Sequence, residues 1–530
     1  MNKLTHIELF AGCGGMSLGL ETAGFDLLFA NELSPMASET FAHNLLNETL
    51  EGNESPKKTL WIKSQFPKNE IEKRLRENPF EAPKGKYSDI DDNTVLDEKL
   101  LIGDINELLT AFEEKPALLN AIRNNDVDLI SGGPPCQSFS LAGKRERDNH
   151  KNTLPASFAR IAGMIQPKTV LLENVKGITS PFTENGRKYY AWLEVSKAFV
   201  LEGFVPVCMM LNSKYFGVPQ NRPRFILIAY RKDIFDKIFM KHVKNEILTV
   251  SNDFYKTVLD NQKDLDSVTI KNFKYYDIES NPELFDGVIL PKITHFERDF
   301  INTSEAIGDI RRTQLNYAFD NTKGKYANIL NSIFLKDSYR DSIIKNHEPR
   351  NHNLLIKSRF RFYQVIEQFQ NGLKQGAIDL FTGKEVSEEL RSKLLNEFSH
   401  HKLLFPDNMA SREVLMTPEN IDEVEELIKL IPTKKHSQRA LQEFEPAPAQ
   451  LTIPDDLCHY HSDHPRTLTV REMARFQSFP DWFEFKSKVT TGGQMRKFEV
   501  PQYTQVGNAV PPLLAKFLGE TIKKQLKEIL

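Results

Sequence analysis

The sequence feature that most constrains the fold lies in residues 126–143, DVDLISGGPPCQSFSLAG, where a short apolar run ends abruptly. Val127, Leu129 and Ile130 form the run, and its length and flanks predict a buried strand of a parallel sheet. Glycines and prolines at 132–135 end the strand, and Cys136 follows directly. Open α/β sheets place their chemistry in loops after the carboxyl ends of strands, so the pattern predicts a thiol presented at a site. The alternative is a cysteine packed as a small apolar residue, although the polar residues after it favour a solvated loop.

A strand, a glycine turn and a helix open the chain in a similar way. Residues 6–11 predict the strand, residues 12–15 (GCGG) the turn, and residues 16–23 an amphipathic helix. Glycines let the backbone approach a ligand and a helix N-terminus directs N–H donors at it, which is typical of a nucleotide-type cofactor site. A second predicted strand, 25–30, leads to Glu32 at about the interval at which an acid binds ribose hydroxyls. The alternative for Glu32 is an acid in the first turn of a helix.

Two further strands are each predicted to end at a carboxylate. Residues 100–105 predict a third strand with Asp104 at its end, where the alternative is a turn aspartate. Residues 169–172, which are apolar after Thr169, lead to Glu173. An unpaired buried acid is costly, so a carboxylate in that position favours a functional role.

The last two predicted strands, residues 205–211 and 225–229, flank the sequence QNRPR. Arg222 and Arg224 are two residues apart, so in extended structure they share one face. The alternative is a pair of surface ion-pairing arginines. Strands that alternate with helical segments in this way predict an α/β fold.

Six blocks of the chain, in this order, resemble those of the DNA cytosine-5 methyltransferases of bacterial restriction-modification systems. The blocks are FAGCGG, GPPCQSFS, ENV, QNRPR, RTLTVREMARFQSFPDWFEF and QVGNAVPP. The resemblance implies a Rossmann-like α/β fold of the S-adenosylmethionine-dependent methyltransferases, with a mostly parallel sheet and a smaller, irregular target-recognition domain. Residues 1–234 would form the catalytic and cofactor-binding lobe, 235–464 the target-recognition domain, and 465–530 a return that completes the catalytic lobe.

The resemblance also assigns roles to individual residues. Catalytic roles fall to Cys136, Glu173, Arg222 and Arg224. Binding of S-adenosyl-L-methionine falls to Phe10, Gly12, Gly14, Gly15, Glu32, Asp104, Ile105, Pro134, Asn508 and Val510. Asp104 would receive the adenine amino group, and no metal is expected.

The chemistry that the resemblance implies is consistent with these side chains. Cytosine C5 is a poor nucleophile, but a Cys136 thiolate adding at C6 creates an enamine whose C5 can attack a methyl sulfonium. Arg224 would raise the thiolate fraction, and a protonated Glu173 would donate to ring N3 and accept from the exocyclic amine. A stacked base is out of reach, so the cytosine must flip out of the duplex. No side chain identifies itself as the base that removes the C5 proton.

Double-stranded DNA is the expected macromolecular partner. The family-like blocks stop between about 235 and 460, but residues 321–360 hold eight Lys or Arg and three Asp or Glu, with histidines and aromatics interleaved. Such a stretch in a chain of net charge −3 predicts a DNA-facing surface, and the alternative is a solvated charged face. Expected DNA contacts are Lys336, Arg340, Lys357 and Arg359 here, and Gln137, Ser138, Arg145 and Arg147 in and after the nucleophile loop.

Residues 47–98 are rich in Lys, Glu, Asn and Pro and are longer than the family's usual connection. They predict a surface insertion with one helix at 69–77. The four cysteines, at 13, 136, 208 and 458, show no metal-like or disulfide spacing, which predicts a reducing compartment. The chain has no signal-peptide core and no run that could cross a bilayer. We therefore expect a cytoplasmic monomer with no membrane partner, acting alongside a separate cognate restriction endonuclease.

Four other functions explain less of the sequence. A dinucleotide oxidoreductase accounts for the glycine turn and Glu32 but not for Cys136, Glu173 and QNRPR together. A cysteine hydrolase needs a histidine partner, and the blocks offer only His6, which lies before the first turn. A non-catalytic DNA-binding relative would lack PCQ or ENV. A tRNA-directed cytosine-5 methyltransferase is usually compact, so the long middle region favours DNA.

Overall fold

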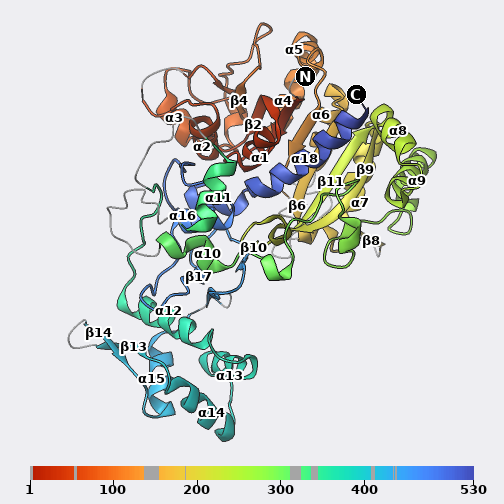
Figure 1. The fold of residues 1–530 in the computed structure, drawn as a ribbon. Helices are drawn as coiled ribbons and strands as arrows, with labels where there is room; N and C mark the ends of the chain where they lie inside the picture. The colour runs from red at the N-terminus through yellow and green to blue at the C-terminus, as the bar shows by residue number, and fades with distance from the viewer. Residues whose placement is uncertain are drawn as a thin grey trace.

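A twisted α/β sheet organises the structure, a computed structural model that describes residues 4–52, 56–135, 154–184, 187–310, 324–335, 344–407, 412–433, 435 and 438–529. Among these residues, nine strands form one sheet in the order β12-β9-β11-β6-β5-β1-β2-β4-β3 (Figure 1). The strands are β1 (Leu4–Leu9), β2 (Phe25–Glu32), β3 (Thr59–Trp61), β4 (Lys99–Ile102), β5 (Leu129–Gly132), β6 (Thr169–Val175), β9 (Phe204–Asn212), β11 (Pro223–Arg231) and β12 (Tyr276–Asp277). Within the sheet, only β11 runs antiparallel to its described neighbours, β6 and β9. The predicted fold class, an α/β fold with a mostly parallel sheet, is confirmed.

Helices cover both faces of this sheet, which explains why its central strands are apolar throughout. Neighbouring residues of one strand enter opposite cores: Leu129 and Leu171 pack with α1 and α18, whereas Ile130 and Leu172 pack with α4, α6 and α7. The covering helices are α1 (Gly15–Ala23), α4 (Ile105–Glu114), α5 (Pro116–Arg123), α6 (Leu154–Ile165), α7 (Ala191–Leu201), α8 (Lys232–Lys241), α9 (Glu246–Asp260) and α18 (Pro512–Ile529). No helix in the described part of the chain has both the length and the apolar composition to cross a bilayer.

Strand ends differ from the sequence prediction where the backbone turns sharply. The first strand ends at Leu9, two residues earlier than predicted, because Phe10 and Gly12 have φ of 56° and 55°. The third strand ends at Ile102, before Gly103, which has φ of 152°. Backbone in the left-handed region cannot continue a strand, so both turns come directly at the sheet edge.

The two ends of the chain build the same lobe. Helix α18 lies against α1, and the termini are close together at the top of Figure 1. Glycines permit this contact, because a Cβ on Gly19 would lie 2.3 Å from the Pro512 carbonyl oxygen and one on Gly519 would lie 2.9 Å from the Ala23 Cβ. The last block of the sequence therefore lies beside the glycine turn that follows β1.

The segment 47–98 is not confined to the surface. Its strand β3 pairs with β4 at the edge of the sheet, and Trp61 is fully buried there. The helix predicted at 69–77 is observed as α3 (Ile71–Arg76). The segment therefore extends the sheet as well as adding a surface loop.

The middle of the chain divides into two structural parts. Helices α8 and α9 and strand β12 pack with the sheet, so the sheet lobe continues past residue 234. Residues 354–431, which we call the helical domain, have a separate core and lie at the far end of the molecule (Figure 1). The elements of the helical domain are α12 (Leu354–Ile366), α13 (Asn371–Phe381), α14 (Glu388–Phe398), β13 (Leu403–Asp407), β14 (Arg412–Met416) and α15 (Ile421–Leu430).

A connecting region lies between the sheet lobe and the helical domain. Its elements are α10 (Thr303–Ile307), α11 (Lys325–Ile333), α16 (Val470–Phe476), α17 (Gln502–Asn508) and the short strands β10 (Gln220–Asn221), β15 (Arg439–Ala440), β16 (Ala447–Pro448) and β17 (Leu457–Cys458). Helix α16 carries buried arginines that hold this region together: Arg475 bridges Asp481 and Asp309, and Arg471 donates to the carbonyl oxygens of Pro480 and Phe483. Each buried charge is paired or hydrogen-bonded, as its burial requires.

Candidate active site

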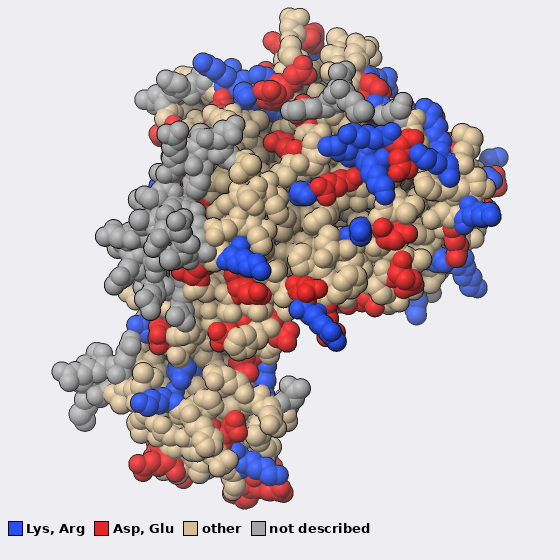
Figure 2. Space-filling model, in the orientation of Figure 1, with Lys and Arg blue, Asp and Glu red and all other residues tan. Residues whose placement is uncertain are grey.

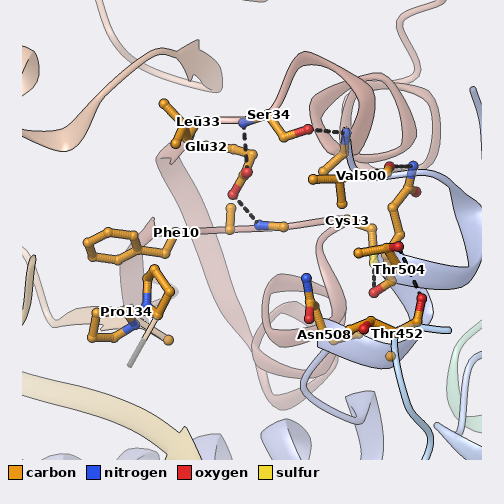
Figure 3. Close-up of a pocket in the computed structure, with 18 of the residues that line it drawn as sticks. Phe10, Cys13, Glu32, Leu33, Ser34, Pro134, Thr452, Val500, Thr504 and Asn508 are labelled. Carbon is orange, nitrogen blue, oxygen red and sulfur yellow. Dashed lines mark hydrogen bonds between the residues drawn. The ribbon is translucent and has the colours of Figure 1, made fainter. Parts of the chain in front are cut away.

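A pocket of about 560 Å³ lies at the carboxyl ends of β1, β2, β4, β5 and β6. Figure 3 shows Phe10, Glu32 and Pro134 on its sheet side and Thr452, Val500, Thr504 and Asn508 on the opposite side. The sheet-side residues come from strand ends and the opposite ones from the last part of the chain. All of the predicted cofactor-binding residues except Gly14 line this one cavity, together with the described catalytic residues Glu173, Arg222 and Arg224.

Glu32 is fixed at the end of β2 by two backbone amides. The Gly12 and Ser34 N–H groups each donate to its carboxylate at 2.8 Å (Figure 3). Burial raises the pKa of the Glu32 carboxyl, and the hydrogen bonds from Ser34 and Gly12 oppose that shift. The glycine turn after β1 is thus tied to the acid that the sequence placed after β2, and the remaining lone pairs of the carboxylate can accept from a ligand.

The glycine turn allows another segment of the backbone to approach it closely. A Cβ on Gly15 would lie 2.3 Å from the Val510 carbonyl oxygen, so only glycine fits where the last block crosses the first. Phe10 packs its ring 6.3 Å from that of Phe158, measured between centroids, and also lines the pocket. Asn508 lines the pocket from the end of α17 and is exposed to it.

Asp104 lies at the next strand end along the sheet. It is the N-cap of α4, and its Oδ1 accepts from the Asn106 N–H at 2.8 Å. Ile105 follows it, and both residues line the pocket. Because β2 and β4 are adjacent and parallel, the carboxylates of Glu32 and Asp104 follow neighbouring strands at the same edge of the sheet.

Glu173 and Arg224 form the ionic part of the catalytic side. They come from the antiparallel strands β6 and β11, and Arg224 Nε lies 2.8 Å from Glu173 Oε1 with both side chains mostly buried. Burial lowers the pKa of the Arg224 guanidinium, and the Glu173 carboxylate beside it opposes that shift. A paired carboxylate in a buried strand is held in one orientation.

The loop that leads to Cys136 runs directly beside this ion pair. A Cβ on Gly133 would lie 3.0 Å from Glu173 Oε2, so a larger residue at that position would crowd the carboxylate. Asn174 Nδ2 donates to the Pro134 carbonyl oxygen at 3.0 Å. The ENV block therefore fixes the backbone at Pro134 as well as supplying a carboxylate.

Arg222 occupies a different environment from Arg224. Its Nη2 donates to the carbonyl oxygens of Gly507 and Ala509 at 2.9 and 3.1 Å, and its Nη1 donates to that of Gln450 at 3.3 Å. Burial, and then the charge of Arg224, lower the pKa of the Arg222 guanidinium. Although Arg222 lines the pocket, its donors hold backbone carbonyls, so it positions the turn that carries Asn508.

Several pocket residues were not identified from the sequence. Glu8, inside β1, accepts from the Ser17 hydroxyl, and burial raises its pKa to about 8. The sequence could have indicated Glu8 as a site residue, because it is an acid within an apolar strand. The other segments carry no such signal, because they reach the pocket from distant loops; they are 79–80, 450–452 and 496–500.

Some of the residues expected to act in catalysis or DNA contact lie outside the described part of the chain. Others contact neighbouring parts of the protein. Those outside are Cys136, Gln137, Ser138, Arg145, Arg147, Lys336 and Arg340. Lys357 and Arg359 lie on α12, where Arg359 donates from Nε and Nη2 to the carbonyl oxygens of Ile431 and Pro432 at 2.9 and 2.5 Å. DNA contact by Lys357 and Arg359 stays a prediction.

The basic stretch 321–360 is less exposed than expected. Its described aromatics Tyr326, Phe334 and Phe360 are buried in hydrophobic cores and do not form part of the surface. On the face shown in Figure 2, positive and negative side chains are interspersed over the sheet lobe and the helical domain. The sequence gives the number of charged and aromatic side chains, but it does not show which of them are buried.

Comparison with known proteins identifies relatives along nearly the whole chain. The profile of the family described as C-5 cytosine-specific DNA methylase matches residues 4–72 and 96–524. The chain is 26% identical over 525 residues to the type II methyltransferase M1.HphI of Haemophilus parahaemolyticus, covering 98% of this chain and 87% of that protein. It is 24% identical over 533 residues to M.DdeI of Desulfomicrobium norvegicum, covering 99% of this chain and 89% of that protein.

The family match includes the strand ends that carry Glu32, Asp104, Glu173 and Arg224, and the C-terminal wall that carries Asn508. These are the residues that the structure brings into one pocket. The chain therefore belongs to the C-5 cytosine-specific DNA methylase family, and the protein is a DNA (cytosine-5) methyltransferase.

Proposed function

We propose that this enzyme transfers a methyl group from S-adenosyl-L-methionine to C5 of a cytosine flipped out of a specific double-stranded DNA sequence, through a covalent adduct with Cys136. The observation that carries the proposal is the shared pocket, in which the Glu32 and Asp104 carboxylates and the Glu173–Arg224 pair line one cavity. A group transfer requires donor and acceptor to meet in one enclosed space.

The residues present fit the methyl donor. Two carboxylates from adjacent strand ends are acceptors suited to ribose hydroxyls and to the adenine amino group. Phe10, Ile105 and Pro134 offer apolar surface for a purine ring. When bound, S-adenosyl-L-methionine supplies an electrophilic methyl group on its sulfonium.

The side chains of the enzyme activate the target cytosine. The Cys136 thiolate adds to C6 of cytosine, which makes C5 nucleophilic, and leaves again once the C5 proton has been lost. Glu173 donates to ring N3 and accepts from the exocyclic amine, while Arg224 holds the Glu173 carboxylate in place at 2.8 Å. Base flipping brings the ring to these groups.

The acids at the cofactor end give the first prediction. Glu32→Ala and Asp104→Ala are each expected to weaken S-adenosyl-L-methionine binding by about 1–3 kcal/mol, because each removes hydrogen-bond acceptors for the ligand. Isothermal titration calorimetry measures the change. DNA affinity without cofactor should stay the same in both variants, and unchanged cofactor affinity in both would contradict the assigned roles.

We also propose that residues 235–464 select the DNA sequence. The helical domain supports this proposal, because it has its own core and lies away from the sheet lobe. The curated relatives M1.HphI and M.DdeI are type II methyltransferases, so we propose that this enzyme is likewise the modification enzyme of a restriction-modification system with a separate endonuclease.

A domain exchange tests where specificity resides. Helices α8 and α9, strand β12 and the residues as far as Ile293 pack with the sheet, so the graft into a related enzyme of different specificity should begin at residue 294 and end at 464. We expect the chimera to methylate the target sequence of the donor and to lose that of the host, as read by bisulfite sequencing. A control chimera in which the host receives its own segment back through the same junctions reports on folding. An active chimera that keeps the host sequence would place specificity outside this span.

Bisulfite sequencing of a plasmid that carries the gene tests the function as a whole. It should reveal protected cytosines at one recurring motif, and a plasmid encoding the Cys136→Ser variant should show none. Methylation assays on duplex DNA and tRNA side by side distinguish the proposed substrate from RNA. Methylation confined to tRNA would overturn the proposal.

A further inference from the structure

The segment that the family profile leaves unmatched contributes to the pocket. The match stops at residue 72 and resumes at 96, yet Pro79 and Phe80 both line the cavity. This wall of the pocket therefore comes from a part of the chain that the family profile does not match. The side chain of Phe80 is 50% exposed, so it presents a large apolar surface at the pocket.

A rigid frame holds this part of the chain, residues 64–87, which we call the cap loop. Its ends are joined by the Ser64–Tyr87 bridge, and Glu77 accepts from the Ser64 hydroxyl and the Gln65 N–H at 3.0 and 3.1 Å. Arg74, inside the loop, pairs with Asp89 at 2.7 Å and is buried. A loop whose polar groups are satisfied internally keeps one conformation, and this one keeps Phe80 in place.

The cap loop is attached on both sides of the cofactor end of the pocket. It leaves the sheet at β3, beside β4, and Lys63 just before it pairs with Glu107 of α4 at 2.6 Å. On the other side, Arg76 pairs with Glu39 of α2 (Pro35–Leu45) at 3.4 Å. Helix α4 begins after Asp104, and α2 begins after Glu32, so the loop spans the two strand ends that carry the cofactor carboxylates.

The turn that carries Phe80 is itself ordered by hydrogen bonds. Asn78 Oδ1 accepts from the Phe80 N–H at 3.1 Å, and the Asn78 carbonyl oxygen accepts from the Glu81 and Ala82 N–H groups. Phenylalanine carries no hydrogen-bonding group, so Phe80 can contribute to the pocket only by apolar contact and by stacking. Of the groups in an adenosyl ligand, the purine ring is the one that such a side chain recognises.

We propose that Phe80 is a positioning residue for the cofactor, stacking against the adenine ring from the part of the cap loop that the family profile does not match. The inference rests on the proposed use of S-adenosyl-L-methionine, whose adenosyl end would lie between Glu32 and Asp104. Phe80 takes no part in the methyl transfer itself. It sets cofactor affinity.

Substitution of Phe80 tests this role. Phe80→Ala is expected to raise the Kd for S-adenosyl-L-methionine by about tenfold or more, because a base–aromatic stack is lost. Phe80→Trp should restore binding, whereas Phe80→Leu, which is apolar but cannot stack, should not. The KM for the cofactor should rise by the same factor as the Kd, with kcat at saturating cofactor unchanged.

A truncated ligand locates the contact. 5′-Methylthioadenosine contains the adenosine but lacks the amino acid, so Phe80→Ala should weaken its binding by the same factor. Tyr87→Ala is the matched control, since Tyr87 is an aromatic of the same loop with 46% exposure that does not line the pocket. The control should bind both ligands as the wild type does.

Two outcomes contradict the inference, and they differ from failure of the proposed function. A Kd within twofold of wild type for Phe80→Ala, or full binding by Phe80→Leu, would overturn the stacking role while the wild type still binds the cofactor. Absence of S-adenosyl-L-methionine binding by the wild type would instead overturn the proposed function. Thermal unfolding of Phe80→Ala without ligand distinguishes loss of the stacking contact from loss of the fold.

Discussion

Cys136→Ser is expected to lower turnover on the order of 10³-fold or more while leaving the fold and cofactor binding intact. The serine hydroxyl is nearly isosteric, but its pKa is far too high for it to attack C6 of cytosine as an oxyanion at neutral pH. Single-turnover methylation of duplex DNA with labelled cofactor measures the loss. Turnover at a tenth of the wild-type rate would remove Cys136 from the nucleophile role.

A covalent trap separates the nucleophile from other causes of inactivity. Duplex DNA that carries 5-fluorocytosine cannot lose a proton from C5, so the adduct with Cys136 should accumulate and survive denaturing electrophoresis. The serine variant should give no such band. Cys208→Ser is a suitable control, because Cys208 is buried in the sheet and does not line the pocket; it should trap as the wild type does.

Glu173→Gln is expected to reduce kcat by about 10²–10³-fold, with the Kd for S-adenosyl-L-methionine unchanged. Glutamine keeps the shape of the side chain but cannot donate a proton to cytosine N3 from an acid group. In the enzyme without bound DNA, the substitution also removes the negative charge that lies 2.8 Å from Arg224 Nε. Rapid-quench methylation assays at saturating DNA and cofactor measure the rate of the chemical step.

Removing the charge of Glu173 also affects the stability of the fold, which needs a separate measurement. Arg224 would remain buried without its partner, which destabilises the fold by a few kcal/mol. Calorimetric binding of the cofactor therefore reports whether the variant is folded. Glu194→Gln, which breaks an ion pair with Lys197 outside the pocket, is the matched control and should keep full activity. A kcat for Glu173→Gln within threefold of wild type would contradict the role of Glu173.

Local patterns in the sequence were sufficient for the sheet and for the polar ends of its strands. Runs such as 169–172 predict buried strands because apolar length and abrupt ends are properties of a few adjacent residues. Glu32, Asp104 and Glu173 each follow such a run, and parallel strands end at one edge, so their gathering in a pocket follows from the fold class. The resemblance of the six short blocks added the chemistry.

Only the tertiary structure decided which distant groups meet. Arg222 shares a motif with Arg224, yet it binds carbonyl oxygens of Gln450 and Gly507, more than 200 residues away in the chain. Phe80 and residues 496–500 enter the pocket because the fold brings their loops there, and no local pattern encodes that meeting. The same limit applies to burial: Tyr326 and Phe360 are interleaved in a basic stretch that predicts a DNA-facing surface, but both are buried in hydrophobic cores. Composition states which side chains are available, whereas packing between distant segments decides which of them face a ligand.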